Sequence, residues 1–218
     1  MRVLFEDNHC IAVMKPHGVL TQGDKTGDPS LFDEVKKYLK EKGNKKGEAF
    51  LGLVHRLDRP VGGVVVFAKT SKGAARLSEQ FRAHKVVKTY WAIVEGKPNE
   101  SEGVVVSWLK KDERTNTVHS YKKETDGALR AELHYRVLKT RDDKSLVEIT
   151  PNTGRPHQIR VAMRSLGCPI VGDLKYGSTT SLGHAIALFA RSLSFKPVVG
   201  GNPITVVAEP ELSLFEGD

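Results

Sequence analysis

The segment HRLDRP, residues 55–60, places one carboxylate among cations. Asp58 has Arg56 two positions before it and Arg59 directly after it. Neighbouring positive charge favours the ionised form of a carboxylate. An ionised carboxylate in a cleft can act as a nucleophile, a general base or an electrostatic stabiliser. It can equally be one half of an ordinary loop salt bridge, so the residue types alone leave both interpretations open.

The residues that follow Asp58 favour a positioned group. Pro60, Gly62 and Gly63 indicate a rigid turn and a close approach of the backbone. The run 63–69 is apolar without alternation, which is typical of a strand covered on both faces. Such a strand would anchor the loop firmly, and this shifts the balance towards a functional role for the carboxylate.

The rest of the chain predicts the elements that hold this loop in place. Residues 3–15 contain two short strands around a turn. Helices are predicted after the caps Ser30 and Ser71 and between Pro156 and Gly167. Further strands are expected at 88–95, 103–109, 129–138, 145–150, 185–193 and 204–208. Strands outnumber helices and do not alternate strictly with them, so we predict the α+β class.

Composition narrows the class of protein. The 218 residues are 28% charged and 39% hydrophobic, with a formal net charge of +8. This surplus favours an anionic partner such as nucleic acid, although a basic surface without a special role has the same composition. The chain has no signal peptide pattern and no apolar run of membrane-spanning length, so we expect a soluble protein of the cytoplasm, or of an organelle after processing. No repeat or linker divides it.

Several common chemistries lack their motifs here. The two cysteines are too few for a disulfide framework or a cysteine-based zinc site. There is no Walker loop, no GxSxG, no GxGxxG and no HExxH. The eight histidines are scattered without the spacing of metal ligands. We therefore expect no structural or catalytic metal.

Four segments together resemble one enzyme family. The stretch HRLDRPVGGVVVFAKT closely resembles the catalytic segment of the RluA family of pseudouridine synthases, whose motif centres on HRLD. In the family's order, VMKPHGVLTQGD resembles its lysine–proline–glycine segment, KTYWAIVEG its tyrosine segment, and TGRPHQIRVAMRSLGCPIVGDLKYG its arginine segment. The resemblance covers residues 3–193, and four ordered motifs are far more specific than one.

The resemblance implies an architecture and a substrate class. It predicts the pseudouridine synthase fold, a mixed and mainly antiparallel central sheet with flanking helices and a catalytic cleft. One catalytic domain, 1–218, is expected, without the small S4 domain of many relatives, so that this domain itself would grip the RNA. The partner would be rRNA or tRNA, with no membrane, no metal and no cofactor, and the protein is expected to be a monomer.

The resemblance also assigns catalytic roles. The target uridine would be flipped out of its RNA into a pocket. Asp58 would then attack or deprotonate the ribose side, the glycosidic bond would break, and the uracil would rotate and rejoin through carbon. Arg160 would pair with Asp58 and keep it ionised, and Tyr90 would stack on the uracil. Arg56 would fill the gap left by the base or contact its phosphate.

Four further residues are placed near the substrate by the same motifs. Ile170 would add an apolar wall to the pocket. Lys15, His55 and His157 would lie in the substrate-binding region, where the two histidines would orient loops instead of catalysing.

Departures from the family pattern are modest. Val61-Gly62-Gly63 stands where Thr-Ser-Gly is common, and Ala162 where histidine is frequent. Two other functions remain open. A non-catalytic RNA-binding module would need phosphate-binding cations but no buried carboxylate facing an anion. A hydrolytic glycosidase would need a second carboxylate at a fixed distance, and no motif here supplies one.

The charge distribution yields a first prediction. RNA affinity should fall steeply with salt, with a log–log slope of several units, because phosphate contacts release counterions. The contacts are expected, at least in part, from Lys36, Lys37, Lys45, Lys46, Arg76, Arg82 and Lys85. Binding to a uridine-containing RNA across a salt series measures the slope. An affinity independent of salt would contradict the prediction. If replacing Lys36 and Lys37 by Gln left the slope unchanged, these two lysines would be ordinary solvent-exposed residues that do not contact phosphate.

Overall fold

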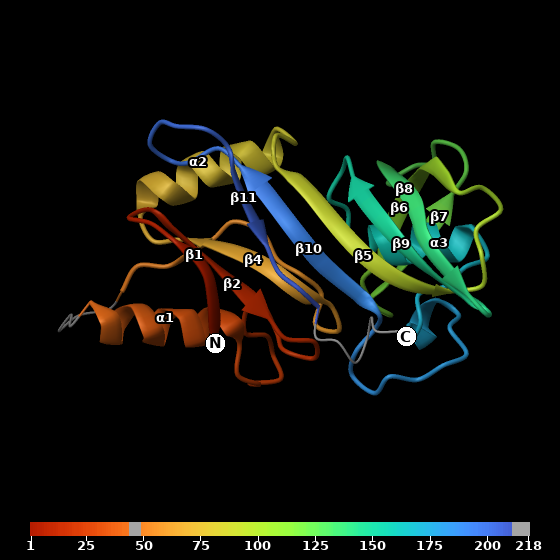
Figure 1. Cartoon of the computed structure of the whole chain (residues 1–218), viewed down its shortest axis with the longest axis horizontal. Helices are drawn as coiled ribbons and strands as arrows, with labels where there is room; N and C mark the ends of the chain where they lie inside the picture. Colours follow the sequence, from red (N-terminus) through yellow and green to blue (C-terminus); the bar gives the residue numbers. More distant parts are fainter. Residues whose placement is uncertain (44–48, 211–218) are drawn as a thin grey trace. The chain divides into compact units, whose positions relative to one another are not determined.

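The structure is a computed structural model that describes residues 1–43 and 49–210 (Figure 1). The predicted phosphate contacts Lys45 and Lys46 lie outside the described residues. The described residues form two compact units: unit 1 is Met1–Val87 with Ala190–Pro210, and unit 2 is Lys88–Phe189. Within them are 11 strands and three α-helices, which agrees with the α+β prediction. No described helix has the length and apolar character needed to span a bilayer.

The strands of unit 1 run in the order β1-β2-β4-β10, with β3 paired to β4 and β11 paired to β10. The pairs β1–β2, β2–β4, β3–β4 and β10–β11 are antiparallel. The bounds are β1 Arg2–Glu6, β2 Cys10–Lys15, β3 Gly52–Leu53, β4 Gly62–Ala68, β10 Leu188–Phe195 and β11 Ile204–Val207. In Figure 1, α1 lies below and α2 above β1, β2 and β4.

Strand β4 is the central strand of unit 1. All seven of its residues are buried, as its unbroken apolar sequence predicts. It lies between β2 and β10. At its start Gly63 has φ +120°, and a Cβ there would lie 2.3 Å from the carbonyl oxygen of Ala190 in β10. Only glycine allows this backbone conformation and this approach, so the turn after Asp58 depends on it.

The helices of unit 1 begin at polar caps. Helix α1, Leu31–Lys42, is capped by Ser30, whose hydroxyl accepts from the Asp33 N–H, as predicted. Helix α2, Ser71–Arg82, is capped by Thr70, whose hydroxyl accepts from the Gly73 N–H at 3.0 Å. The prediction of Ser71 as the cap was wrong by one residue, because the extended backbone of Thr70 presents the earlier hydroxyl to the first turn.

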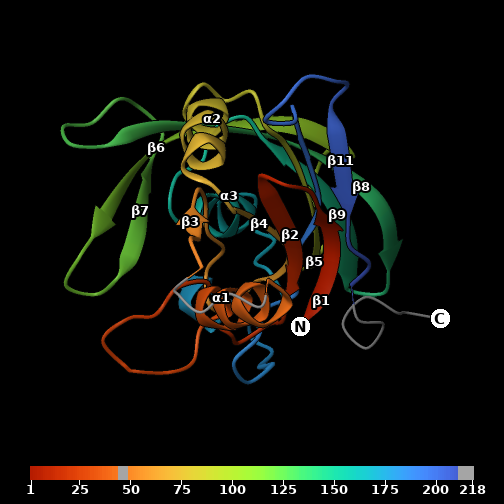
Figure 2. The same cartoon turned by 90° about the vertical axis from the view of Figure 1, so that its left-hand side faces the viewer.

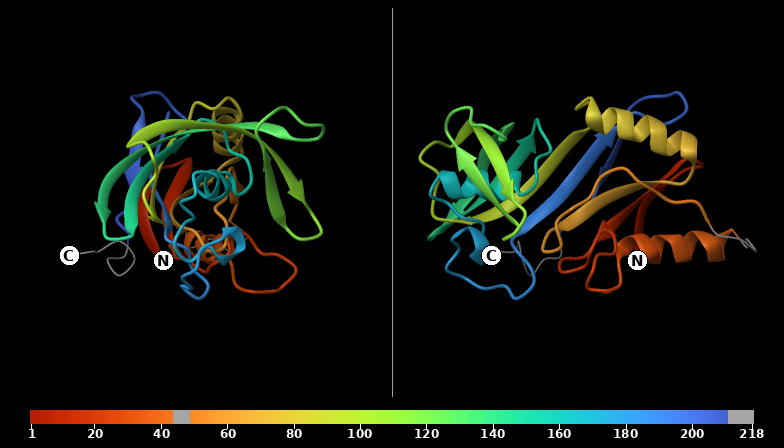
Figure 3. Two further views of the ribbon diagram at one scale, coloured as in Figure 1. Left: turned by 90° about the vertical axis from the view of Figure 1, so that its right-hand side faces the viewer. Right: turned by 180° about the vertical axis from the view of Figure 1, so that it is seen from behind.

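Unit 2 contains a sheet with the order β5-β9-β8-β6-β7, in which all neighbours are antiparallel. The bounds are β5 Val87–Glu95, β6 Glu102–Asp112, β7 Thr117–Tyr121, β8 Leu129–Arg141 and β9 Lys144–Pro151. Figures 2 and 3 show a curved sheet with helix α3, Gln158–Ser165, on its inner side.

The two faces of this sheet differ in burial. Along β8, Ala131, Leu133 and Tyr135 are buried, whereas the intervening His134 and Arg136 are exposed. Strand side chains alternate between faces, so the first set defines an inner face and the second an outer face.

One apolar cluster covers the inner face. It joins three strands to α3 and to the 3-10 turn η1, Leu174–Tyr176, and consists of Leu109, Val118, Ala131, Val161 and Tyr176. The helix is therefore held on the sheet by its apolar side.

Helix α3 starts later than predicted. Its N-cap is His157, which has φ 50° in the left-handed region, so Pro156 lies before the helix and not in its first turn. A left-handed backbone is uncommon for a residue other than glycine, and the sequence pattern carried no sign of it. Gly167, with φ +73°, follows the helix and ends it as predicted. The short elements β3, β7 and η1 were not predicted.

The close contact at Gly63 yields a second prediction. Gly63→Ala should lower the free energy of unfolding by about 2 kcal/mol or more, because the methyl group meets the β10 backbone and φ is positive. Gly23→Ala is the matched control, since a Cβ at Gly23 has nothing within 4 Å. Urea denaturation of both variants measures the difference, and equal stability of the two would contradict the prediction.

Candidate active site

The loop that carries Asp58 is fastened to the segment before α1 by one buried hydroxyl. Thr21 Oγ1 donates to the Leu57 carbonyl at 2.8 Å and accepts from the Leu57 N–H at 3.2 Å. Thr21 is only 3% exposed. Two bonds on the residue next to Asp58 fix the backbone from which the carboxylate projects.

Arg59 continues this attachment. Its carbonyl accepts from the Gly18 N–H at 2.9 Å, and its Nε donates to the Gly18 carbonyl at 3.0 Å. Its guanidinium also forms an exposed ion pair with Asp28 at 2.8 Å. Arg59 therefore connects the Asp58 loop to the segment between β2 and α1, which contains Gly18 and Asp28. The other cation of the motif, Arg56, is exposed.

Lys15 is the most unusual group in unit 1, because a lysine is rarely buried completely. Its relative exposure is 0%. Its ammonium donates to the carbonyls of Pro16 at 3.0 Å, Val19 at 2.6 Å and Arg59 at 3.1 Å. Burial lowers the pKa of Lys15 to about 7, and the charge of Asp58 acts in the opposite direction. The sequence placed Lys15 in the substrate-binding region, but the structure places its ammonium on backbone carbonyls inside unit 1.

His55 also has structural partners. Its Nε2 accepts from the Val66 N–H of β4 at 3.0 Å, and its ring stacks on Phe81 of α2 with centroids 4.5 Å apart. A ring nitrogen that accepts a backbone N–H carries no proton, so a neutral His55 has its proton on Nδ1. These contacts attach the segment of His55 to β4 and to α2.

In unit 2, Arg160 is held by a carboxylate that the sequence analysis did not assign. Its Nε and one terminal nitrogen each donate to Asp173 at 2.7 Å. The side chains are 7% and 1% exposed, so the pair is almost completely buried. The Arg160 guanidinium also lies over the Tyr176 ring, 4.9 Å from its centroid. A bidentate contact and a ring plane together set both the position and the tilt of the guanidinium.

Tyr176 connects Arg160 to the start of α3 and to β7. Its hydroxyl lies 2.6 Å from His157 Nδ1 and accepts from the Val118 N–H at 2.9 Å. The side chain is 2% exposed. His157, predicted in the substrate-binding region, thus has one ring nitrogen engaged inside unit 2.

The turn before α3 is tied down by Gln158. Its Oε1 accepts from the Arg155 N–H at 3.0 Å and from Thr153 Oγ1 at 2.7 Å, while its amide donates to the Glu132 carbonyl at 2.9 Å. Lys88 Nζ approaches the Thr153 carbonyl at 3.4 Å, and burial lowers the pKa of this lysine. These bonds give the irregular segment before the helix a defined conformation.

Tyr90 lies on the same face of the sheet as α3. It is the register partner of Ile149, and both belong to the inner set that includes the buried Ala92. Its neighbour Trp91 points to the outer face, where its indole N–H approaches Glu148. Unit 2 therefore places the predicted catalytic residues Tyr90 and Arg160 on one side of its sheet.

Ile170, predicted as an apolar wall, is fully buried and forms an isolated bridge with Val94 of β5. Unit 1 holds the other predicted site residues, Lys15, His55, Arg56 and Asp58. Sequence analysis missed Thr21, Asp173 and Tyr176. The segment GDLKYG contained the last two, but the contacts that give them a role are tertiary.

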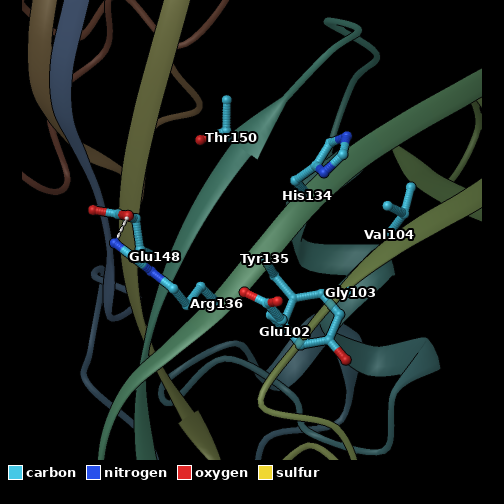
Figure 4. A pocket seen from close by; sticks show the side chains of 8 residues that line it. All are labelled: Glu102, Gly103, Val104, His134, Tyr135, Arg136, Glu148 and Thr150. Carbon is cyan, nitrogen blue, oxygen red and sulfur yellow. Dashed lines mark hydrogen bonds and ion pairs between the residues drawn. The ribbon is translucent and has the colours of Figure 1, made fainter.

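A pocket on the outer face of unit 2 contains none of these groups (Figure 4). It holds the Arg136–Glu148 ion pair, 2.8 Å long. Its lining residues are Glu102, Gly103, Val104, His134, Tyr135, Arg136, Glu148 and Thr150. Among the described residues, no group of three or more His, Cys, Asp or Glu side chains could hold a metal ion.

Comparison with known proteins decides the family. The family model described as RNA pseudouridylate synthase matches residues 9–165. The chain belongs to the RNA pseudouridylate synthase family. This confirms the resemblance that the four motifs indicated, since three of them lie entirely within the match and the fourth begins in it.

Relatives in the family cover most of the chain. It is 36% identical over 210 residues to a ribosomal large subunit pseudouridine synthase C of Rickettsia felis, covering 95% of this chain and 67% of the relative. For the same enzyme of Rickettsia conorii the chain spans 60% of the relative's length. An RNA pseudouridine synthase of Zymomonas mobilis is 36% identical over 93% of both chains.

A solved family structure confirms the fold. Human RNA pseudouridylate synthase domain containing 4 aligns with a TM-score of 0.83 and 27% identity over 98% of this chain and 90% of that one. The predicted pseudouridine synthase fold is therefore correct.

The buried lysine yields a third prediction. Lys15→Met should lower the free energy of unfolding by about 2–4 kcal/mol, because three carbonyls lose their donor. The wild-type pKa is lowered to about 7 from 10.5, so above pH 7 the unfolded chain binds more protons than the folded one. Stability should therefore rise with pH between about 7 and 10, by up to about 1.4 kcal/mol per unit.

This rise should be absent in Lys15→Met and kept in Lys72→Met, which changes an exposed lysine of α2. Urea denaturation at several pH values between 7 and 9 makes the comparison. Identical pH dependence in the wild type and in Lys15→Met would contradict the prediction.

Proposed function

We propose that the protein isomerises specific uridines in RNA to pseudouridine. Family membership carries this proposal, because the matched residues 9–165 include Asp58, Tyr90 and Arg160. The geometry within each unit supports it. The loop of Asp58 is held by buried polar contacts, and the guanidinium of Arg160 is fixed in position and tilt. Such preorganisation is what a reaction that depends on placing charged groups requires.

In the proposed reaction the uridine is flipped out of its RNA. Asp58 either forms a bond to the ribose or removes a ribose proton to give a glycal, and the glycosidic bond breaks. The uracil then rotates and its ring carbon bonds to the ribose, which breaks the Asp58–ribose bond or, in the glycal route, returns the proton from Asp58 to the ribose. The ring carbon loses its proton, and the nitrogen that was attached to the ribose gains one. Atoms and electrons balance within the nucleotide, so no redox cofactor and no external nucleophile take part.

We assign the remaining roles from the family motifs. Arg160 pairs with Asp58 and keeps it ionised, Tyr90 stacks on the uracil, and Arg56 contacts the flipped nucleotide or fills its gap. Lys15, His55 and His157 act by positioning loops, and their hydrogen bonds within each unit support this. Residues 1–218 would form one catalytic domain around a cleft.

The substrate is proposed to be ribosomal or transfer RNA. Several relatives are named as ribosomal large subunit synthases, which makes large-subunit rRNA the first RNA to test. We further propose that the protein works as a cytoplasmic monomer without a metal. A non-catalytic RNA-binding module is not favoured, since binding alone would not require Asp58, Tyr90 and Arg160 together.

A fourth prediction tests the mechanism. Asp58→Asn keeps the shape of the side chain but removes its charge, so turnover should become undetectable while RNA binding survives. Arg160→Met should be nearly as damaging. Asp24→Asn, an exposed change of the same type, should be fully active. Pseudouridine is mapped by chemical modification and reverse transcription, in cellular RNA with and without the gene and with each variant restored.

Stability must be measured beside activity, because Arg160→Met also leaves Asp173 buried without its partner. An ordinary salt-bridge role would reduce stability and leave turnover normal. A folded Asp58→Asn protein that still converts uridine would end the case for this mechanism.

A further inference from the structure

Asp173 is buried, charged and bound to a predicted catalytic residue, and neither the motifs nor the proposed reaction gave it a role. We propose that Asp173 is a positioning residue for turnover: it holds one edge of the Arg160 guanidinium and thereby fixes the direction of the N–H donors on the adjoining edge, which pair with Asp58 in the proposed reaction. This inference rests on the proposed function, in which Arg160 pairs with Asp58.

The hydrogen-bond pattern carries the proposal. A guanidinium has about five N–H donors in one plane. Asp173 takes the Nε donor and one terminal donor, both at 2.7 Å, and so occupies a single edge. The other N–H donors lie on the two terminal nitrogens, along the adjoining edge of the same plane. A carboxylate bound there would be held at a fixed angle to Asp173 by the rigid, planar group.

The backbone fixes Asp173 itself. Its N–H donates to the Ile170 carbonyl at 2.9 Å, and its carbonyl accepts from the N–H groups of Tyr176 at 3.0 Å and Ser178 at 3.1 Å. The preceding Gly172 has φ +87°, and a Cβ there would lie 2.9 Å from the Ala185 carbonyl. The carboxylate is thus mounted on a short turn that has little freedom to move.

The same turn supplies a second constraint on Arg160. Tyr176, three residues after Asp173, places its ring 4.9 Å from the guanidinium. Asp173 sets where the guanidinium lies and Tyr176 sets how it tilts. A salt bridge needed only for stability would not require this ring, and a buried pair is a poor source of stability compared with apolar packing. The arrangement is better suited to aiming a charged group than to holding the fold.

The charge balance points to the same role. Asp173 places a negative charge 2.7 Å from the Arg160 guanidinium inside unit 2, where both side chains are less than 10% exposed. A guanidinium that already has one carboxylate attracts a second one less strongly. Arg160 can then orient Asp58 without binding it so tightly that the carboxylate loses its reactivity towards the ribose.

The first test is the kinetics of Asp173→Asn with a target RNA. Asparagine cannot accept from both guanidinium donors, so kcat should fall about 10- to 100-fold while KM changes less than about threefold. Arg136→Gln removes an exposed ion pair of unit 2 and should behave as the wild type. A kcat for Asp173→Asn within twofold of the wild type would overturn the proposal.

A double-mutant cycle shows whether Asp173 acts through Arg160. Arg160→Lys keeps a charge but lacks the planar fork, and it should retain measurable activity. Adding Asp173→Asn to Arg160→Lys should then lower kcat by less than about threefold, because lysine has no planar guanidinium for Asp173 to orient. An equal loss in both backgrounds would mean that Asp173 acts independently of Arg160, and the proposal would be wrong.

Asp173→Glu keeps the proposal testable if Asp173→Asn does not fold. It retains the charge and moves the carboxylate by one methylene, so a folded protein with about tenfold lower kcat and unchanged KM is expected. Wild-type kcat in that variant would overturn the proposal. Failure of the proposed function looks different: the wild type itself would form no pseudouridine, or Asp58→Asn would remain active.

Discussion

The peptide groups of a loop form no regular backbone hydrogen bonds, so they must find other hydrogen-bond partners. In unit 1 the buried amino group of Lys15 is such a partner. It binds three carbonyls from two separate segments, Pro16 and Val19 on one side and Arg59 on the other. Lys15 is itself set by its place at the end of β2, opposite Gly63 of β4. The geometry of the Asp58 loop therefore depends on one amino group, whose burial is costly unless its N–H groups are hydrogen-bonded.

Unit 2 also depends on buried polar side chains. Gln158, the first residue of α3, holds the irregular segment before the helix, and Asp173 lies in the segment after it and binds Arg160. Asp58 lies in backbone without regular structure, whereas Arg160 lies in α3 and is held by a carboxylate from the segment after the helix. In both units the position of the predicted group depends on side-chain contacts with little exposure to water, which are stronger and less mobile than surface contacts.

Much of the fold could be predicted from the sequence because its signals are local. Three examples are the unbroken apolar run of β4, the Ser30 cap of α1 and the end of α3 at Gly167. Each depends only on residues near it in the sequence. The elements that escaped prediction, β3, β7 and η1, are each five residues or shorter and carry little periodicity. Site residues could be predicted only where a family motif assigned a role to that position. The roles of Lys15 and Asp173 depend on partners distant in sequence or on burial, which no local pattern reveals.

Tyr176 has a consequence beyond the site. Strand β7 ends the sheet order of unit 2 and exposes one row of peptide groups that could pair with another chain. The Tyr176 hydroxyl takes the Val118 N–H in that row, and Val118 itself is buried beneath it. That N–H is therefore already bonded within the protein, and it is not available to a strand of another molecule. The residue that tilts Arg160 thus also removes one donor from this edge of the sheet.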